Sequence, residues 1–333
     1  TSLTWGQTTH YSMVEYWRWW LVHLWVEGFF EVFATAVLAL LFTRLGLIRA
    51  STANSAIVLE TIVFLFGGIL GTLHHLYFTG TPTFVIAIGA MFSALEVVPL
   101  AMIGFEAYNS FQRAKAAPWV QSYKWSIMCF IAVGFWNVVG AGLLGFTINT
   151  PIALYYLQGL NMTAAHGHAA LFGVYGMLGI GLLLFCLRGL SDRLAWSDKL
   201  LAPMFWCLNI GLAMMVFISL VPAGIYQAWA SITQGMWFAR SAEFVHSPLM
   251  ETLVWMRVPG DIVFAIGTVF LAWFAIRLLT GGKKQPVLAG ASLTKRAWAP
   301  TARARGRPPP PLAPAFFSNF FESCRRIFMS HHC

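Results

Sequence analysis

Residues 16–46 read YWRWWLVHLWVEGFFEVFATAVLALLFTRLG, an apolar run longer than the roughly 20 residues that a helix needs to cross a bilayer. Within this run, His23, Glu27 and Glu31 recur at intervals of four residues. Ionisable side chains are costly inside a membrane and usually mark a functional site. The stretch therefore predicts a membrane-spanning helix whose ionisable side chains belong to a functional site.

Composition extends the membrane assignment to most of the chain. Of 333 residues, 58% are hydrophobic and only 10% are charged, against about 25% charged in soluble domains. We predict an all-α polytopic membrane protein with seven transmembrane helices, at residues 16–44, 55–79, 84–112, 122–147, 162–188, 198–229 and 258–280. The connection between the fourth and fifth helices is too short to span, and the one between the sixth and seventh is mixed in polarity and resembles an interfacial helix.

The distribution of Lys and Arg predicts the orientation of these helices. Positive residues follow the first, third, fifth and seventh predicted helices, whereas the connections TGTPT and NTPIALYYLQGLN carry none. Cytoplasmic connections carry the excess of Lys and Arg, so those four ends should face the cytoplasm and the opposite ends should face outward.

The two ends of the chain differ from its middle. The net charge is +9, but seven Lys and Arg residues lie beyond Leu293, so the charge does not imply a nucleic-acid partner. Residues 286–333 are basic and rich in Pro, which predicts a disordered tail. The chain begins without an initiator Met or a signal sequence. We therefore expect a fragment that starts partway through a longer protein.

Five histidines from three predicted helices fall at one depth. His23 lies about six residues inside the outer end of the first helix, His74 and His75 about five residues before the outer end of the second, and His166 and His168 about five residues after the outer start of the fifth. One such histidine is readily explained by a hydrogen bond to a backbone carbonyl. Five at one level indicate a metal or haem site, because neutral imidazole is the commonest metal ligand.

The spacing of these residues refines the prediction. His23 and Glu27, at i and i+4, should project from one helix face and can offer a nitrogen and a carboxylate oxygen to one metal ion. His74 and His75 are about 100° apart around a helix, so both reach one ion only if the helix end adapts. Glu31 continues the face of His23 one turn deeper.

His166 and His168 point about 200° apart on a regular helix, which suits two separate centres such as flat macrocycles on either side. Two explanations remain open for the glycines of the fourth and fifth helices: close helix packing, or close approach of a porphyrin face. These glycines are Gly140, Gly142, Gly145, Gly167, Gly173, Gly176 and Gly179.

Four stretches together resemble a known family: HLWVEGFFE at 23–31, GTLHHLYFTG at 71–80, FSALEVVPL at 92–100 and AAHGHAALFG at 164–173. They are similar to the catalytic subunit of nitric oxide reductase, within the haem-copper oxidase superfamily, and most similar to its quinol-dependent, single-chain type. The resemblance covers roughly residues 5–285. We expect residues 1–285 to form part of a catalytic membrane domain of the haem-copper oxidase type, in a bacterial inner membrane.

The resemblance implies a role for each matching residue. His23, His74 and His75 would bind a non-haem iron with Glu27 as its carboxylate ligand. His166 would be the axial ligand of a high-spin haem b and His168 a ligand of a low-spin haem b. Glu96 and Glu31 would support proton supply or the geometry of the iron site. A calcium ion between haem propionates is left open, as is pairing of Arg240 and Arg257 with those propionates rather than with lipid headgroups.

The implied reaction is the reduction of two nitric oxide molecules to nitrous oxide and water with electrons from quinol. Oxidases of the superfamily carry a tyrosine four residues after the first metal histidine, where this chain has Glu27. A carboxylate is a hard ligand that favours iron over copper. Two alternatives stay open. One is an oxygen-reducing oxidase. The other is an inactive truncated haem-binding fragment, because the second low-spin haem ligand and the electron-entry domain would lie upstream of Thr1. Glu60, near the inner end of the second helix, is expected to be interfacial.

Overall fold

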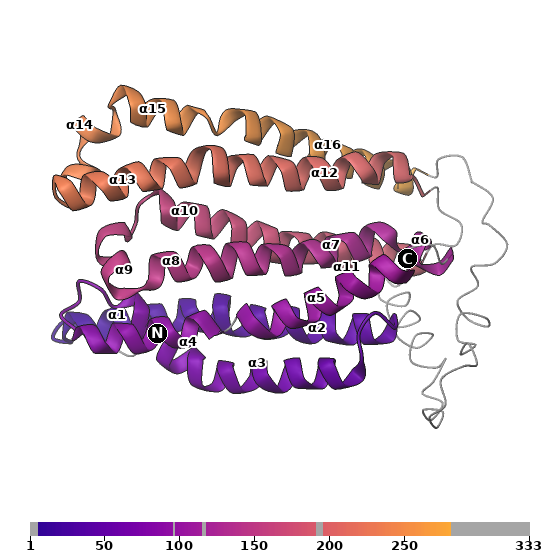
Figure 1. Cartoon of the computed structure of the whole chain (residues 1–333), viewed down its shortest axis with the longest axis horizontal. Coiled ribbons are helices and arrows are strands. Elements are labelled where there is room, and N and C mark those ends of the chain that lie inside the picture. Colours follow the sequence, from indigo (N-terminus) through magenta and orange to yellow (C-terminus); the bar gives the residue numbers. More distant parts are fainter. Residues whose placement is uncertain (1–5, 96, 115–117, 191–195, 281–333) are drawn as a thin grey trace.

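Helices make up almost all of the part of the chain that the structure describes. The computed structural model describes residues 6–95, 97–114, 118–190 and 196–280, and no strand occurs within them. The helices lie side by side in an elongated bundle (Figure 1). Within these residues, seven spans are long and apolar enough to cross a membrane, namely Tyr11–Arg44, Ala50–Gly67, Thr83–Gln112, Lys124–Asn149, Asn161–Gly189, Asp198–Thr233 and Pro248–Leu279. The predicted fold class is confirmed.

The first three spans contain the residues closest to the opening motif. Their elements are α1 (Tyr11–His23), η1 (Leu24–Phe29), α2 (Phe30–Arg44), α3 (Ala50–Leu70), η2 (Gly71–His75), α4 (Thr83–Leu95) and α5 (Val97–Ala114). The first span begins five residues earlier than predicted, and the second ends before the histidines that the sequence pattern had placed inside it.

The remaining elements form four further spans and their connections. They are α6 (Pro118–Ser122), α7 (Lys124–Trp136), η3 (Asn137–Leu144), α8 (Gly145–Asn149), α9 (Pro151–Leu157), α10 (Asn161–Gly167), η4 (His168–Gly176), α11 (Met177–Leu190), α12 (Asp198–Met214), η5 (Met215–Leu220), α13 (Val221–Thr233), η6 (Phe238–Arg240), α14 (Ala242–Val245), α15 (Pro248–Trp255) and α16 (Val258–Leu279). The predicted interfacial segment is therefore split, and its last helix, α15, joins the seventh span.

Four spans are interrupted by π-helical segments, namely η1, η3, η4 and η5. A π segment inserts an extra residue into an α-helix and frequently accompanies a functional site. Two of the four adjoin histidines of the predicted layer: His23 is the last residue of α1, immediately before η1, and His168 is the first residue of η4. The π segments are as apolar as the α-helices around them, so the hydropathy of the sequence did not predict them.

Small residues allow the helices to approach closely. A Cβ on Gly104 would lie 3.0 Å from the Cα of Gly134, and one on Gly211 would lie 2.5 Å from the backbone nitrogen of Phe264. Such close backbone contacts are typical of membrane bundles, where helix packing rather than the hydrophobic effect holds spans together. The interior is filled by large side chains such as Trp136, Phe42 and Phe130.

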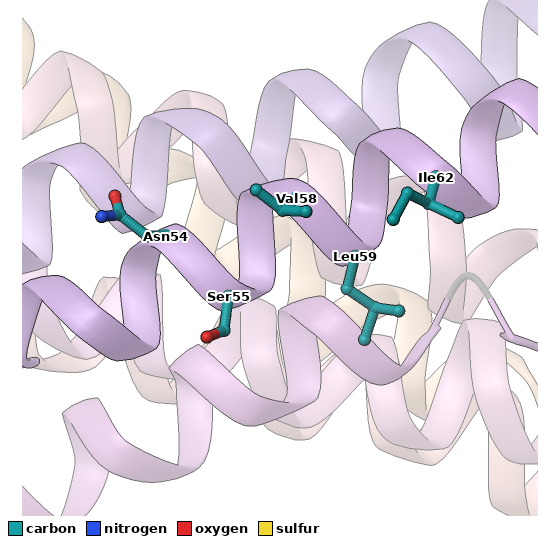
Figure 2. Close-up of a pocket in the computed structure, with 5 residues that line it drawn as sticks. All are labelled: Asn54, Ser55, Val58, Leu59 and Ile62. Atoms are coloured by element: carbon teal, nitrogen blue, oxygen red, sulfur yellow. The ribbon is translucent and has the colours of Figure 1, made fainter.

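The outward face of the bundle is apolar, as expected for contact with lipid. A shallow groove of about 430 Å³ runs along one face of α3, lined by Asn54, Ser55, Val58, Leu59 and Ile62 (Figure 2). None of these side chains is ionisable, and four of the five are exposed. We regard the groove as part of the lipid-facing surface.

The bundle has two distinct ends. One end, here called the histidine end, contains η2, α9 and α10 (Figure 1). The opposite end, here called the far end, contains those positive residues used to predict the orientation that the structure describes, namely Arg44, Arg49, Arg113, Lys124, Arg188, Lys199 and Arg277. The segregation agrees with a far end in the cytoplasm, which stays a prediction. The predicted tail, 286–333, lies outside the described residues.

Candidate metal centre

His23 occupies the junction between two kinds of helix. It is the last residue of α1 and is fully buried. Its Nε2 lies 3.4 Å from the carbonyl oxygen of Gly67, near the end of the second span. One turn earlier, the indole of Trp19 stacks on the ring of His75, with centroids 4.4 Å apart and planes 7° apart. The first span therefore positions one histidine directly and a second through an aromatic contact.

His74 and His75 lie on a tightened helical turn. After Gly71 the second span becomes the 3₁₀ segment η2, which has three residues per turn rather than 3.6. The chain then reverses through Phe78, with φ 63°, and Gly80, with φ 86°. Adjacent residues of a 3₁₀ turn are about 120° apart, so the two rings meet through their side-chain rotamers at the end of the helix. Their Nε2 atoms are 2.8 Å apart.

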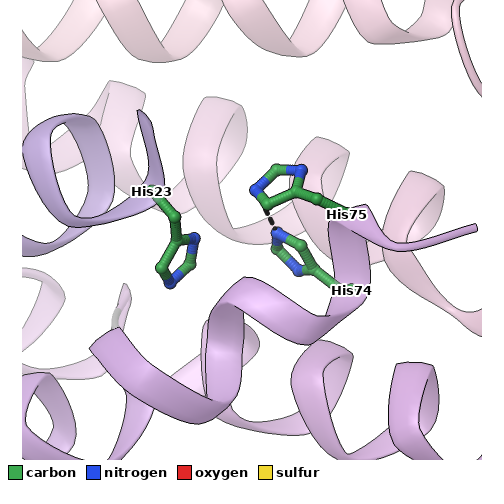
Figure 3. A group of neighbouring side chains, drawn as sticks. All are labelled: His23, His74 and His75. Carbon is green, nitrogen blue, oxygen red and sulfur yellow. Dashed lines mark hydrogen bonds between the residues drawn. The ribbon is translucent and has the colours of Figure 1, made fainter. Parts of the chain in front are cut away.

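The three histidines converge on one point. One ring nitrogen from each of His23, His74 and His75 lies within 4.8 Å of the others, and Figure 3 shows the three rings turned toward one another from two helices. Ring centroids are 5.3 Å apart for His23 and His74, 5.5 Å for His23 and His75, and 4.0 Å for His74 and His75.

This donor set fits a transition-metal ion. Nitrogens that each lie about 2 Å from one ion are separated by about 3 Å when their bonds meet at a right angle. The spacing of His74 and His75 is close to that value, so only His23 needs a small approach. Imidazole nitrogens suit iron, copper and zinc alike, so the histidines alone do not select the metal.

A glycine on the third span makes room for η2. A Cβ added to Gly89 of α4 would lie 2.3 Å from the backbone nitrogen of His74 and 2.8 Å from the carbonyl carbon of Leu73. Both are backbone atoms, which cannot move away by a change of side-chain rotamer. Gly89 therefore allows α4 to pack directly against the turn that carries two of the histidines. No motif had singled out this residue, and nor had any singled out Trp19.

The predicted carboxylates are only partly described. The backbone of Glu27 lies in η1, a π turn, and its side chain lies outside the described residues, so the shared helix face expected for His23 and Glu27 stays a prediction. Glu96 lies outside them as well. Glu31 is 6% exposed in the first turn of α2. It follows His23 by eight residues, about 12 Å along a helix, and so lies behind the cluster.

His166 and His168 have different surroundings. Nδ1 of His166 lies 2.8 Å from the carbonyl oxygen of Gly140 on the fourth span, whereas Nδ1 of His168 lies 2.8 Å from the carbonyl oxygen of Ala164 in its own helix. A carbonyl oxygen only accepts, so Nδ1 of each ring donates and Nε2 keeps its lone pair. This arrangement suits two axial ligands of separate haems.

The glycines divide between the two explanations left open by the sequence. Cβ atoms on Gly140 and Gly173 would clash with Ala169 and Trp136, and one on Gly145 would lie 3.0 Å from the His166 ring, so these three serve close packing. Among the described residues, no atom lies within 4 Å of a Cβ built on Gly167 or Gly179. Packing does not account for these two, and Gly167 separates the two histidines.

The two arginines considered for propionates have protein partners. Arg240 donates to the carbonyl oxygens of Met236 and Gln158, at 2.7 and 2.6 Å, and burial lowers the pKa of its guanidinium. Nε of Arg257 lies 3.1 Å from a carboxylate oxygen of Asp261. Arg240 thus joins the connection after the fourth span to the connection after the sixth.

Comparison with known proteins identifies the family. The model of the family described as "Cytochrome C and Quinol oxidase polypeptide I" matches residues 2–263. The chain belongs to this family. It is also 30% identical over 263 residues to a nitric oxide reductase subunit from Stutzerimonas stutzeri, an alignment that covers 76% of this chain and 53% of that protein. The chain therefore spans about half the length of the curated relative that it matches.

Membership agrees with the histidine geometry. A membrane oxidoreductase of this family is expected to hold haem and a further metal, and the chain brings three histidines together at one point and presents two more on the fifth span. The predicted resemblance to the haem-copper oxidase superfamily is confirmed, as is likeness to nitric oxide reductase.

Proposed function

We propose that the chain forms the catalytic core of a nitric oxide reductase. Two nitric oxide molecules, two electrons and two protons would give nitrous oxide and water, with quinol as the electron donor. The observation that carries the proposal is the convergence of His23, His74 and His75 in a chain similar to a nitric oxide reductase subunit. Glu27 supports it, because a carboxylate four residues after the first histidine favours iron over copper.

The chain's own residues would act mainly by positioning. His23, His74 and His75, with Glu27, would hold a non-haem iron, while His166 and His168 would hold the high-spin and low-spin haem b groups. Together these groups would bind nitric oxide and supply the electrons. The stack of Trp19 on His75 and the Nδ1 hydrogen bonds of His166 and His168 fix ring orientations before any cofactor binds.

Burial is the second contribution of the protein. His23 and His74 are at most 1% exposed, so bulk water is excluded from that side of the cluster. A dry site strengthens the interaction between the metal and a carboxylate such as Glu27. It also means that protons must arrive through protein groups, for which Glu31 and Glu96 are the proposed carriers.

The experiment that tests this function is an anaerobic assay of the full-length protein with reduced quinol. Nitric oxide consumption with nitrous oxide formed at half the molar amount, in a protein that contains two haems and one further iron per chain without copper, is the expected result. Reduced cytochrome c tested in place of quinol identifies the donor. Turnover only with the cytochrome would retain the reaction and reject the donor.

An oxygen-reducing oxidase is the second candidate, because the matched family is described by its oxidases. Oxygen uptake much faster than nitric oxide consumption, together with copper in the purified protein, would favour it. Haem binding without turnover on either substrate would instead identify an inactive haem-binding protein.

A further inference from the structure

Among the described residues, three carboxyl side chains of the first two spans are buried. Glu15 pairs with Arg18, and the other two are Glu31 and Glu60. Glu31, in α2, is 6% exposed, and Glu60, in α3, is 2% exposed. Glu60 also lies ten residues after Ala50, the first residue of α3, so the expectation that it is interfacial is wrong. Among the described residues, Oε2 of Glu60 has no hydrogen-bond partner. Because an unpaired carboxylate is costly in such a place, the position favours the protonated acid.

Both carboxyls lie on the inward faces of their helices. The buried residues recur at intervals of three or four. On α2 they are Glu31, Ala34, Thr35, Leu38, Ala39 and Phe42, and on α3 they are Ala53, Ala56, Glu60, Val63 and Gly67. The two helices run antiparallel and pack against each other (Figure 1). Each carboxyl is therefore directed into the bundle rather than toward lipid.

The helix register places the two carboxyls at the same depth. The contact of His23 with the Gly67 carbonyl aligns the two spans near the histidine end. From it, Glu31 is eight residues farther along the first span and Glu60 seven residues back along the second, about 12 and 10 Å at 1.5 Å per residue. The π turn η1 adds a residue with little rise and reduces this difference. Both groups lie deeper than the cluster, toward the far end.

We propose that Glu31 and Glu60 form a proton-holding carboxyl pair that supplies the histidine cluster. The proposal rests on the proposed function, in which 2 NO + 2 H⁺ + 2 e⁻ gives N₂O + H₂O with quinol as the reductant. Two neighbouring carboxyls in a poorly solvated interior do not both ionise, so the pair retains a proton at rest. When the cluster consumes a proton, the pair passes its proton on as another enters from the far end, so the pair stays singly protonated.

The surroundings of the pair support uptake from that end. Thr35 lies one turn beyond Glu31, is fully buried, and its Oγ1 has no hydrogen-bond partner among the described residues. Its hydroxyl can both donate and accept, as a relay requires. α4 carries no ionisable residue, and on α5 the described carboxylate is Glu106, which binds Arg49 at 3.1 Å near the far end. Glu96 and the side chain of Glu27 lie outside the described residues.

Infrared difference spectroscopy tests the pair without requiring turnover. Reduction of the full-length protein should change a carboxylic C=O band that shifts in D₂O, and both Glu60→Gln and Glu31→Gln should shift or remove that band. Glu106→Gln, which changes a membrane carboxylate with its own Arg partner, should leave it unchanged. A band that responds to Glu31→Gln but not to Glu60→Gln would exclude Glu60 from the pair.

Turnover provides the second readout. Glu60→Gln should lower nitric oxide consumption about 10- to 100-fold, at or below the effect of losing a general acid, while the haem and iron content stays unchanged. Glu60→Asp should recover part of the rate. Full turnover of Glu60→Gln would overturn the proposal. If Glu60→Gln loses haem or iron, the test uses Glu60→Asp instead. A shifted carboxylic C=O band with reduced turnover in this variant supports the pair. An unshifted band with full turnover rejects the pair.

Different results would reject the proposed function and the carboxyl pair. A wild-type protein that consumes no nitric oxide would reject the proposed function, yet the infrared band would still report on Glu31 and Glu60. A nitric oxide reductase whose band is insensitive to both residues would keep the function and reject the pair.

Discussion

At the scale of single residues, His74 offers a direct test of the cluster. It is 1% exposed, and its Nε2 lies 2.8 Å from that of His75. We expect His74→Ala to lower non-haem iron to less than about a tenth, since even partners outside the coordination shell change metal affinity 10- to 100-fold. Elemental analysis with optical spectra checks this result, and both haem signals should remain.

The matched control is His10→Ala. His10 is exposed and its ring binds Ser12 at the start of α1. This variant should keep its full iron content. Iron retained at the wild-type level in His74→Ala would remove His74 from the site.

Gly89 tests how tightly α4 packs against η2. In Gly89→Ala the new Cβ would lie 2.3 Å from the backbone of His74, so α4 and η2 must separate. Overpacking of this kind costs about 1–3 kcal/mol, and the displaced turn should also bind iron more weakly. Thermal unfolding in detergent and elemental analysis measure the two effects.

Gly179→Ala is the control for a methyl group added to a membrane helix. Among the described residues, no atom lies within 4 Å of a Cβ at this position. Its stability should be unchanged or slightly raised, because Ala favours a helix over Gly by up to about 1 kcal/mol. Equal effects of the two substitutions would mean that the contact between α4 and η2 is not tight.

At the scale of elements, changes of helix type place the candidate ligands. His74 and His75 lie in η2, where the second span ends, and η1 and η4 begin beside His23 and at His168. Neither an α turn, with about 100° between adjacent residues, nor a 3₁₀ turn, with about 120°, aligns neighbouring histidines by itself. The sequence predicted which residues belong to the layer, but not these local geometries, because a π or 3₁₀ turn is stabilised by packing against neighbouring spans.

The connections at the histidine end depend on Arg240. Its two hydrogen bonds, to the carbonyls of Gln158 and Met236, link segments that precede the fifth span and follow the sixth. We expect Arg240→Met to destabilise the protein by about 2 kcal/mol or more, since a hydrogen bond from a charged group contributes about 1.5–3 kcal/mol. Lys199→Met, an exposed positive residue at the far end, should change thermal stability little. An unchanged melting temperature for Arg240→Met would show that the link is dispensable.

At the scale of the whole molecule, the orientation in the membrane can be measured. We predict that Ser51→Cys, at the far end, reacts with a membrane-impermeant thiol reagent only from the cytoplasmic side, and Ala242→Cys, at the histidine end, only from the opposite side. Both positions are exposed, and the experiment needs a background without Cys324 and Cys333. Labelling from the reversed sides would invert the orientation derived from Lys and Arg.

The sequence by itself determined the seven spans and the histidine layer. Whether a segment enters a bilayer depends on its own apolar residues, and the cost of an ionisable group there depends on the type of residue, so both can be read from a linear sequence. The tertiary structure decided what no single span contains: the approach of His23 to His74 and His75, the stack of Trp19, the gap left by Gly89 and the burial of Glu60. Each of these depends on which helix faces meet and how closely their backbones approach, and that is set by packing between distant parts of the chain.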